Sequence, residues 1–455
     1  MKVFRVLALI AVVTLAESAA GQTLTILHAF SGIDGSGPIS GLVQGSDGNF
    51  YGTASLGGAS NTGTVFRISS GGTYTNLHSF NGTDGAGPIA NLVQATDGNF
   101  YGLTYIGGAH DVGTVFRMSP GGALTNLYSF SGSDGANPFF GALVQGSDGN
   151  LYGTTQAGGT GNSGTVFRIS TTGNFTNLYS FHGVDGALPY DGLARGNDGS
   201  FYGTTFGGGT SNRGTVFRIT PTGDLTNLHS FVVSDGQHPF GGLVLGSDGN
   251  FYGTASVGNH SNGTVFRISP GGVFTNLHSF SPVPDGAEPI ATLIEGSDGN
   301  FYGTTFSAGP GSSGTVFRIS SSGSFTNLHS FNGTDGGFLN GAVMQGSDGS
   351  FYGTTTEGGT NNNGTVYRLT VPLSSPSYPI NQITAVLPSG PDMVFGLTSV
   401  AGETYQLQAS SSMNPTNWSN VAGVCVSNAI GATLTVTNAG GATGPQEFYR
   451  FAITP

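Results

Sequence analysis

The chain has 455 residues and a formal net charge of −12, with only 8% charged residues and 81 glycines. Its one lysine is Lys2, and such an acidic chain is a poor candidate for binding nucleic acid or an anionic membrane surface. The single cysteine, Cys425, excludes a fold that depends on an internal disulfide. Aromatic residues make up 11% of the chain, which argues against the disorder that a glycine-rich composition otherwise suggests.

The N-terminus has the pattern of a signal peptide. Lys2 and Arg5 precede an apolar run over residues 6–15, and Ser18-Ala19-Ala20 supplies a small-residue cleavage site. We therefore expect a signal peptide over residues 1–20 and an exported protein, located outside the cell or in the periplasm. The apolar run is shorter than the roughly 20 residues of a spanning helix, so we expect no membrane insertion.

A unit of about 50 residues then recurs seven times. Each copy contains Gly-Thr-Val and an aromatic residue, starting at Gly63, Gly113, Gly164, Gly214, Gly263, Gly314 and Gly364. An Asp-Gly turn keeps step with it, at Asp47, Asp97, Asp148, Asp198, Asp248, Asp298 and Asp348. Such a period with strand and turn residues is typical of a propeller or an array.

Each unit reads as four strands, illustrated by residues 90–94, 100–105, 114–119 and 124–130. The Asp-Gly-Asn segment between the first two strands favours a type I′ hairpin. The third strand is apolar on both faces, with Val115 facing one way and Phe116 the other. Burial on both faces is what a blade wedged between two neighbours requires.

The two ends of the repeat array complement each other. Residues 24–30 form a lone fourth strand, and the seventh unit stops after a third strand at residues 365–370. We predict an all-β, seven-bladed propeller of four-stranded blades over residues 21–371, closed by pairing of the N-terminal strand with the last blade. An open solenoid would need polar capping repeats, which the sequence lacks.

The unit also resembles a known family. Residues 42–53 read L-V-Q-G-S-D-G-N-F-Y-G-T, residues 63–69 read G-T-V-F-R-I-S, and residues 75–86 read T-N-L-H-S-F-N-G-T-D-G-A. Over roughly residues 24–370, this pattern resembles the GloVer tandem repeats of secreted bacterial proteins. The resemblance implies a propeller-like fold and export, and it brings no catalytic residues with it.

The composition changes after the last repeat. Residues 372–379 are rich in proline and serine and are predicted to be a linker. Residues 380–455 show alternating apolar runs, which predict a small C-terminal domain like a β-sandwich. Its tryptophan, Trp418, could stack on a sugar, but a role as core anchor is favoured.

Residues present in every copy are interpreted as structural. Each Asp-Gly turn offers one carboxylate, whereas calcium needs 6–8 oxygen ligands, so a turn is favoured over a metal site. Five histidines precede the Ser-Phe or Ala-Phe end of a unit where two other copies have tyrosine, which favours packing over metal binding: His28, His78, His229, His278 and His329. The repeated arginines, Arg67 and its equivalents, are expected to pair with an aspartate or with backbone carbonyls. We predict no catalytic residues, no metal and no cofactor.

Function is sought where the copies differ. The position before the Gly-Ser-Asp turn carries a charge only at Arg195 and Glu295, which could orient a polar ligand or simply be solvated channel residues. The residue after the loop proline is aromatic in three successive copies, at Phe139, Tyr190 and Phe240. Its neighbours Phe140, Asp191 and His238 complete a candidate ligand-binding sector, with packing between loops as the alternative.

Two functions remain open from the sequence. The first is a non-enzymatic extracellular protein with a binding or structural role, directed toward a polysaccharide or a cell-surface glycan. The second is an extracellular polysaccharide lyase or glycosidase that uses the mouth of the propeller channel. Paired carboxylates at that mouth would favour the enzyme, and their absence would favour binding.

Overall fold

The computed structural model describes residues 22–257 and 262–371 and, within the C-terminal part, the backbone of six strands. The predicted signal peptide and the predicted linker lie outside the described residues. The chain divides into two compact units, residues 1–372 and 373–455. Among the described residues no helix is long and apolar enough to cross a membrane.

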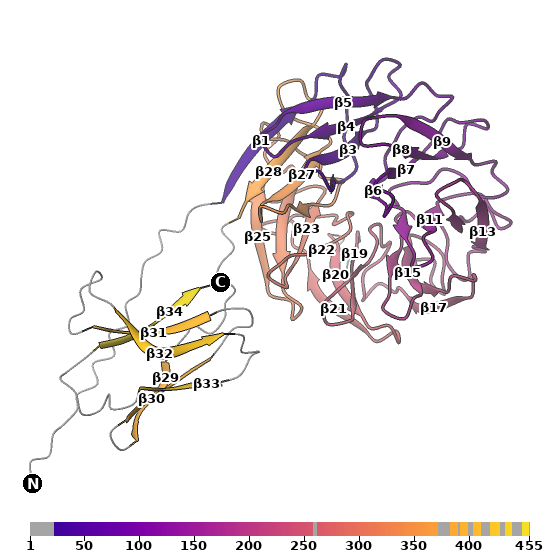
Figure 1. Ribbon diagram of the computed structural model, residues 1–455. Helices are drawn as coiled ribbons and strands as arrows, with labels where there is room; N and C mark the ends of the chain where they lie inside the picture. The colour runs from indigo at the N-terminus through magenta and orange to yellow at the C-terminus, as the bar shows by residue number, and fades with distance from the viewer. Residues whose placement is uncertain are drawn as a thin grey trace, which may run out of the picture. The chain divides into compact units, whose positions relative to one another are not determined.

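The first unit is a ring of seven four-stranded antiparallel sheets, the blades (Figure 1). The innermost strands are β2 (Val43–Gln44), β6 (Val93–Gln94), β10 (Val144–Gln145), β14 (Ala194–Arg195), β18 (Val244–Leu245), β22 (Ile294–Glu295) and β26 (Met344–Gln345). The second strands are β3 (Phe50–Ala54), β7 (Phe100–Thr104), β11 (Leu151–Thr155), β15 (Phe201–Thr205), β19 (Phe251–Ala255), β23 (Phe301–Thr305) and β27 (Phe351–Thr355).

The third strands are β4 (Thr64–Ile68), β8 (Thr114–Met118), β12 (Thr165–Ile169), β16 (Thr215–Ile219), β20 (Thr264–Ile268), β24 (Thr315–Ile319) and β28 (Thr365–Thr370). The outer strands are β5 (Tyr74–Ser79), β9 (Leu124–Ser129), β13 (Phe175–Ser180), β17 (Leu225–Ser230), β21 (Phe274–Ser279), β25 (Phe325–Ser330) and β1 (Thr23–Ala29). Blades are numbered 1 to 7 from β2 to β26.

The ring closes as predicted. Strand β1 pairs antiparallel with β28, from Thr23 opposite Thr370 to Ala29 opposite Thr365, and the last sheet has the order β1-β28-β27-β26. The first and last strands of the propeller lie side by side in Figure 1. The fold class is therefore an all-β, seven-bladed propeller.

The core lies between the blades. Val115 and Phe116 are both fully buried, but they belong to different apolar clusters. Val115 packs in a cluster with Leu143 and Phe167 of blade 3, and Phe116 packs in a cluster with Tyr51 of blade 1. A third strand that is apolar on both faces thus fastens its blade to both neighbours, as its sequence predicted.

Two local expectations are wrong. The innermost strands have two residues rather than five, because the preceding segment crosses the end of the channel and bonds to neighbouring blades, as Phe140 N does to Tyr190 O at 2.8 Å. The Asp-Gly-Asn hairpin is not type I′, which needs two residues of positive φ. Gly48 has φ +81° but Asp47 does not have a positive φ, and Gly45 exchanges bonds with Gly48 and Asn49, so this is a type I turn with a glycine bulge.

The propeller has two different faces. The turn face carries the hairpins that join first to second strands and third to fourth strands. The loop face carries the longer segments that join an outer strand to the next blade and a second to a third strand. Every blade contributes to both faces, because antiparallel strands bring alternate connections to the same end.

In the second unit the described residues form six strands, β29 (Ile383–Ser389), β30 (Asp392–Thr398), β31 (Thr404–Ser410), β32 (Ser419–Ser427), β33 (Thr433–Asn438) and β34 (Phe448–Thr454). They form two three-stranded antiparallel sheets, with orders β29-β30-β33 and β32-β31-β34. Trp418 lies outside the described residues, so its role stays a prediction.

Candidate functional site

The repeated aspartates of the turn face are engaged by their own hairpins. Asp47 accepts hydrogen bonds from the Asn49 amide at 2.8 Å and from the Tyr51 hydroxyl at 2.9 Å. Burial raises the pKa of Asp47, but these bonds outweigh burial and hold the pKa below its ordinary value. The carboxylate is therefore ionised and already bonded, which supports the structural interpretation of the Asp-Gly turns.

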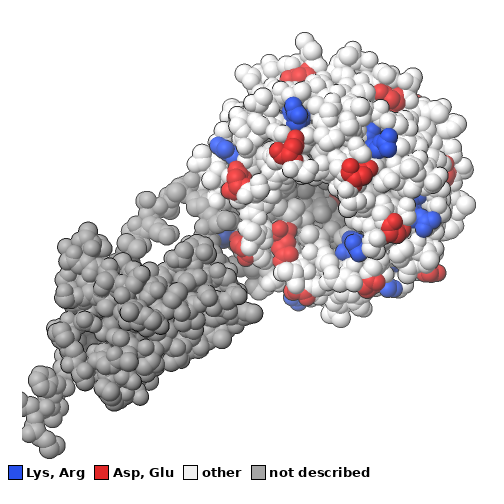
Figure 2. All heavy atoms as spheres, viewed as in Figure 1, with Lys and Arg blue, Asp and Glu red and all other residues white. Residues whose placement is uncertain are grey.

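The repeated arginines lie beside the same tyrosine and aspartate. All seven are half-buried, and each lies across the strand pair from the tyrosine of its blade, as Arg67 does from Tyr51. Arg218 forms an ion pair with Asp198 at 2.8 Å, which is the pairing that the sequence predicted for every copy. In blade 7 the buried Nε of Arg368 has no hydrogen-bond partner, so the pairing is not uniform around the ring. In Figure 2 basic and acidic side chains recur near one another around a central hollow.

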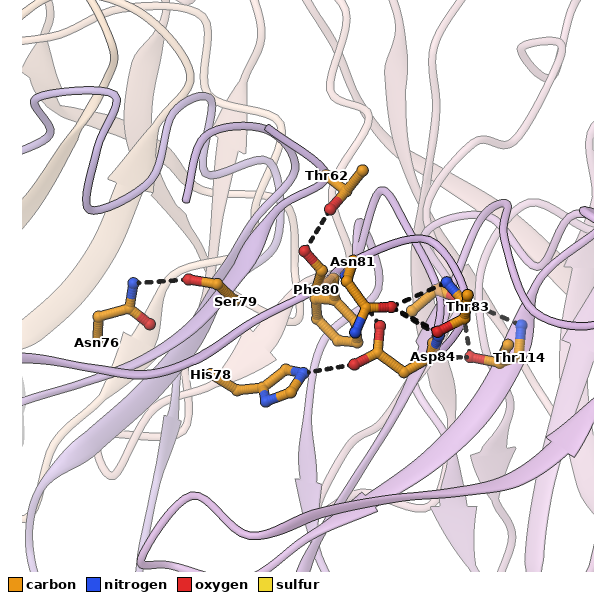
Figure 3. Close-up of polar contacts among 10 residues, drawn as sticks. Thr62, Asn76, His78, Ser79, Phe80, Asn81, Thr83, Asp84 and Thr114 are labelled. Carbon is orange, nitrogen blue, oxygen red and sulfur yellow. Dashed lines mark hydrogen bonds and ion pairs between the residues drawn. The ribbon is translucent and has the colours of Figure 1, made fainter. Parts of the chain in front are cut away.

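The histidines before the Ser-Phe or Ala-Phe landmark anchor the loop face. His78 Nε2 lies 2.9 Å from Asp84 Oδ2, and Asp84 Oδ1 accepts the Asn81 N–H at 3.0 Å (Figure 3). Tyr128 donates to Asp134 in the same way, which explains why histidine and tyrosine replace each other among the copies. The ring also packs on the next blade, since His28 stacks on Tyr74 at 3.9 Å. These contacts fit the predicted packing role.

Three predicted aromatic residues meet on the loop face. The ring centroid of Tyr190 lies 5.0 Å from Phe139 and 4.9 Å from Phe240, and Phe139 and Phe240 are 5.9 Å apart. Phe140 joins them, at 4.5 Å from Phe139 and 5.3 Å from Phe240. The four rings come from three successive blades, and each is half-buried, so part of every ring faces solvent.

Two further rings extend this cluster, and the sequence reasoning missed them. Tyr105 lies 5.5 Å from Phe139, and Phe206 lies 4.7 Å from Tyr190. Both directly follow a second strand, a position that is also aromatic at Phe306 of blade 6, where the ring packs on Phe338, and that is Ser55, Gln156, Ser256 or Thr356 in the other copies. The signal was present, because aromatic substitution at that position could have been compared among the copies. We call the set Tyr105, Phe139, Phe140, Tyr190, Phe206 and Phe240 the aromatic platform.

His238 lies at the edge of the platform. Its ring stacks on Phe206 at 4.6 Å, and its Nδ1 lies 2.9 Å from the Phe206 carbonyl oxygen. Its backbone φ is +55°, close to the +52° of Asn137 and the +57° of Leu188 at the equivalent positions. His238 therefore shapes the platform through packing and a backbone bond.

Asp191 lies beneath the platform and ties three blades together. It belongs to blade 4, yet its carboxylate accepts the Gly242 N–H of blade 5 at 2.8 Å and the Thr292 hydroxyl of blade 6 at 2.5 Å. It also accepts the Gly192 N–H at 2.6 Å. Burial raises the pKa of Asp191, and these three donors oppose that rise. The adjoining cavity holds about 10 Å³, which is the space of a single water.

Glu295 and Arg195 lie on the turn face, away from the platform, and have different roles. Glu295 accepts the Ser247 N–H of the preceding blade at 2.8 Å and the Ser247 hydroxyl at 2.6 Å. Glutamine accepts the equivalent N–H in four other blade pairs, through Gln44, Gln94, Gln145 and Gln345. We call this bond the clasp. Arg195 is exposed and has no acceptor atom, so it cannot form a clasp.

Comparison with known proteins places the chain in a family. The model of the Gloeobacter/Verrucomicrobia repeat matches residues 12–205 and 192–405, which together span most of the chain. The chain belongs to this repeat family. No curated protein matches it.

Solved structures related to this family member are distant. A BP39L lectin from Burkholderia pseudomallei is 11% identical with a TM-score of 0.48, over 72% of this chain and 97% of that one. A protein described as a 6-phosphogluconolactonase from Bacteroides fragilis is 18% identical with a TM-score of 0.46, over 68% and 88%. A polysaccharide lyase, an ulvan lyase, is 9% identical with a TM-score of 0.43, over 74% and 94%. Likeness at this level assigns neither a ligand nor a reaction.

The seventh repeat deviates from its family pattern in register. Leu339 takes the place of the loop proline, because it contacts Gly314 as the loop prolines contact their glycines in other blades. Asn340 therefore takes the position of Tyr190, and it lines the channel cavity with Ile39 and Ile290. The positions that surround the channel mouth are thus aromatic in blades 3 to 5 and are isoleucine or asparagine elsewhere.

Proposed function

We propose that this propeller is an exported, non-enzymatic binding protein whose aromatic platform holds a segment of polysaccharide. The observation that carries the proposal is the contiguous set of six partly exposed rings, contributed by the successive blades 2 to 5. Sugar rings present apolar C–H faces to aromatic rings, and concave or flat aromatic surfaces with a few polar groups suit them. Single exposed apolar residues would need no such explanation.

Two polar groups border the platform beside Phe139. The Tyr105 hydroxyl lies 3.5 Å from Gln156 Nε2, so both groups have remaining capacity for a ligand. Burial raises the pKa of Tyr190, which keeps its hydroxyl neutral and able to donate. Rings and hydroxyls together favour a neutral or weakly charged glycan over a nucleic acid.

Support for the enzymatic alternative is weaker. Glycosidases use two carboxyl groups that flank the scissile bond. Among the residues that line the channel cavity, Asp191 is the one carboxylate, and it is buried and bonded to three donors. A carboxylate that is buried and bonded to three donors, as Asp191 is, favours a structural role over proton transfer.

Alanine at two platform rings tests the proposal. The double variant Tyr190→Ala/Phe240→Ala should bind polysaccharide at least about tenfold more weakly on a glycan array, because each stacked ring contributes on the order of 1 kcal/mol. The matched control is Ile89→Ala/Ile290→Ala, which truncates the same position in blades 2 and 6 and should leave binding unchanged. Equal binding by a folded double variant would reject the platform, and release of reducing sugar by the wild type would favour the enzyme.

A further inference from the structure

Four departures from the repeat meet at one place on the turn face. Position 245 is leucine where five copies have glutamine or glutamate, and a leucine offers no acceptor to the Asn197 N–H of blade 4. Asn197 itself replaces the serine or threonine of the other turns. Ser200 replaces the asparagine that bonds the turn aspartate in five other copies, and Arg195 precedes this turn. Blades 4 and 5 are thus not joined by a clasp, because the leucine side chain has no acceptor.

A cavity of about 160 Å³ lies where this clasp is missing. Its walls come from the β14–β15 turn of blade 4 and from β18, β19 and the β20–β21 turn of blade 5. The lining residues that matter here are Asn197, Asp198, Tyr202, Leu245, Phe251 and Pro270. A cavity of about 150 Å³ accommodates one six-membered ring such as benzene. The space therefore suits a single ring.

The chemistry of the walls divides into an apolar side and a polar mouth. Leu245, Pro270 and the stacked pair of Tyr202 and Phe251, whose centroids are 4.1 Å apart, supply the apolar side. The mouth carries the exposed Asn197 and Asp198, and Asp198 forms an ion pair with Arg218, which lies outside the lining. The side chains of Asp198 and Arg218 are 39% and 34% exposed.

The Asp198–Arg218 pair has the donors and acceptors that neighbouring hydroxyls require. The carboxylate accepts from a hydroxyl, and the guanidinium donates to one. Ser200 leaves this carboxylate oxygen without the asparagine amide that bonds it in five other blades, as Asn250 does to Asp248 at 2.8 Å. An apolar wall beside a paired acceptor and donor matches a ring with one C–H face and several hydroxyls.

We propose that the cavity between blades 4 and 5 is a second carbohydrate site that takes a single hexopyranose residue, at a chain end or a branch. It goes beyond the platform, because it lies on the opposite face and uses other residues. Two sites on opposite faces would let one molecule hold two glycan chains.

Restoring the clasp tests this site. The Leu245→Gln variant reproduces the side chain of the other blades, so it should occupy the mouth and bond the Asn197 N–H. We expect wild-type protein to bind at least one of the methyl α-pyranosides of glucose, mannose and galactose in the millimolar range by calorimetry or saturation-transfer NMR, and Leu245→Gln to bind it at least about tenfold more weakly. Leu245→Phe, which fills the cavity by bulk alone, should do the same.

The control is Glu295→Gln, which changes the equivalent position of blade 6 and keeps the clasp acceptor, and it should bind like the wild type. The platform variant Tyr190→Ala/Phe240→Ala should also keep pyranoside binding, so failure of this site and failure of the platform are distinguishable. The site is overturned if wild-type protein binds none of the three pyranosides, or if folded Leu245→Gln and Leu245→Phe bind them as well as the wild type.

Discussion

The two faces of the propeller contrast in how they vary. On the turn face five of the seven blade pairs share the clasp, and the turn aspartates keep the same tyrosine partner in every blade. On the loop face the channel-lining position changes from isoleucine to aromatic to asparagine around the ring. Contacts between blades thus constrain the turn face, whereas on the loop face the His/Tyr–Asp anchors are constant and the channel-lining positions vary.

Exceptions to this contrast occur in the same sector on both faces. Blades 2 to 5 carry the platform on the loop face, and the clasp is missing at Arg195 of blade 4 and Leu245 of blade 5 on the turn face. The cross-channel carboxylate of Asp191 also belongs to blade 4. The propeller therefore has one sector in which both faces depart from the repeat. The following substitutions compare this sector with the other blades.

The largest expected effect is at Asp191. Asp191→Ala leaves the Thr292 hydroxyl and the Gly192 N–H without their buried acceptor, and it leaves the Gly242 N–H with the Thr292 oxygen alone. We therefore expect a loss of about 2–4 kcal/mol in unfolding free energy. Ser40→Ala, at the equivalent position of blade 1, loses one bond to Thr53 and should cost about 1 kcal/mol. Urea denaturation measures both, and an equal loss in the two variants would remove the distinction between the sectors.

A smaller effect is expected at the clasps. Gln94→Leu copies the leucine of blade 5 into blade 2 and removes the acceptor of the Ser46 N–H, so stability should fall by about 1 kcal/mol. Leu245→Gln should change stability in the opposite direction. Thermal denaturation of the two variants checks the opposite signs. If Gln94→Leu and Leu245→Gln both lowered the melting temperature, a glutamine at position 245 would not form a stabilising clasp.

The smallest effect concerns pH. Burial lowers the pKa of His229, against the attraction of Asp235, so the folded protein resists a proton that the unfolded chain takes up below about pH 6.5. The stability from this histidine is present above that pH and is lost as pH falls below it. His229→Tyr should flatten the decline of melting temperature on acidification, because Tyr128 and Tyr179 make the same bond without titrating there.

The control for this prediction is His110→Tyr, which changes an exposed histidine of a loop and should leave the pH dependence as it is. An unchanged slope in His229→Tyr would contradict the assignment of part of the acid sensitivity to His229.

Sequence alone determined the number of blades, the closure of the ring and the double-sided burial of the third strands. These features follow from periodic strands and turns and from the complementary ends at residues 24–30 and 365–370. Such patterns involve residues that are close in the chain, so they are visible in the sequence. Sequence also located Phe139, Tyr190 and Phe240, because comparison of the copies showed where the repeat departs from itself.

Only the tertiary structure decided which departures meet. Tyr105 and Phe206 join the platform, Asn340 rather than Leu339 faces the channel, and Asp191 bonds to blades 5 and 6. The cavity beside Leu245 likewise needs residues from two blades. The physical reason is that these contacts span the channel or a blade boundary and join residues about 50 or 100 positions apart in the chain. The repeat determines where each strand lies within its blade. It does not determine which side chains of different blades come into contact.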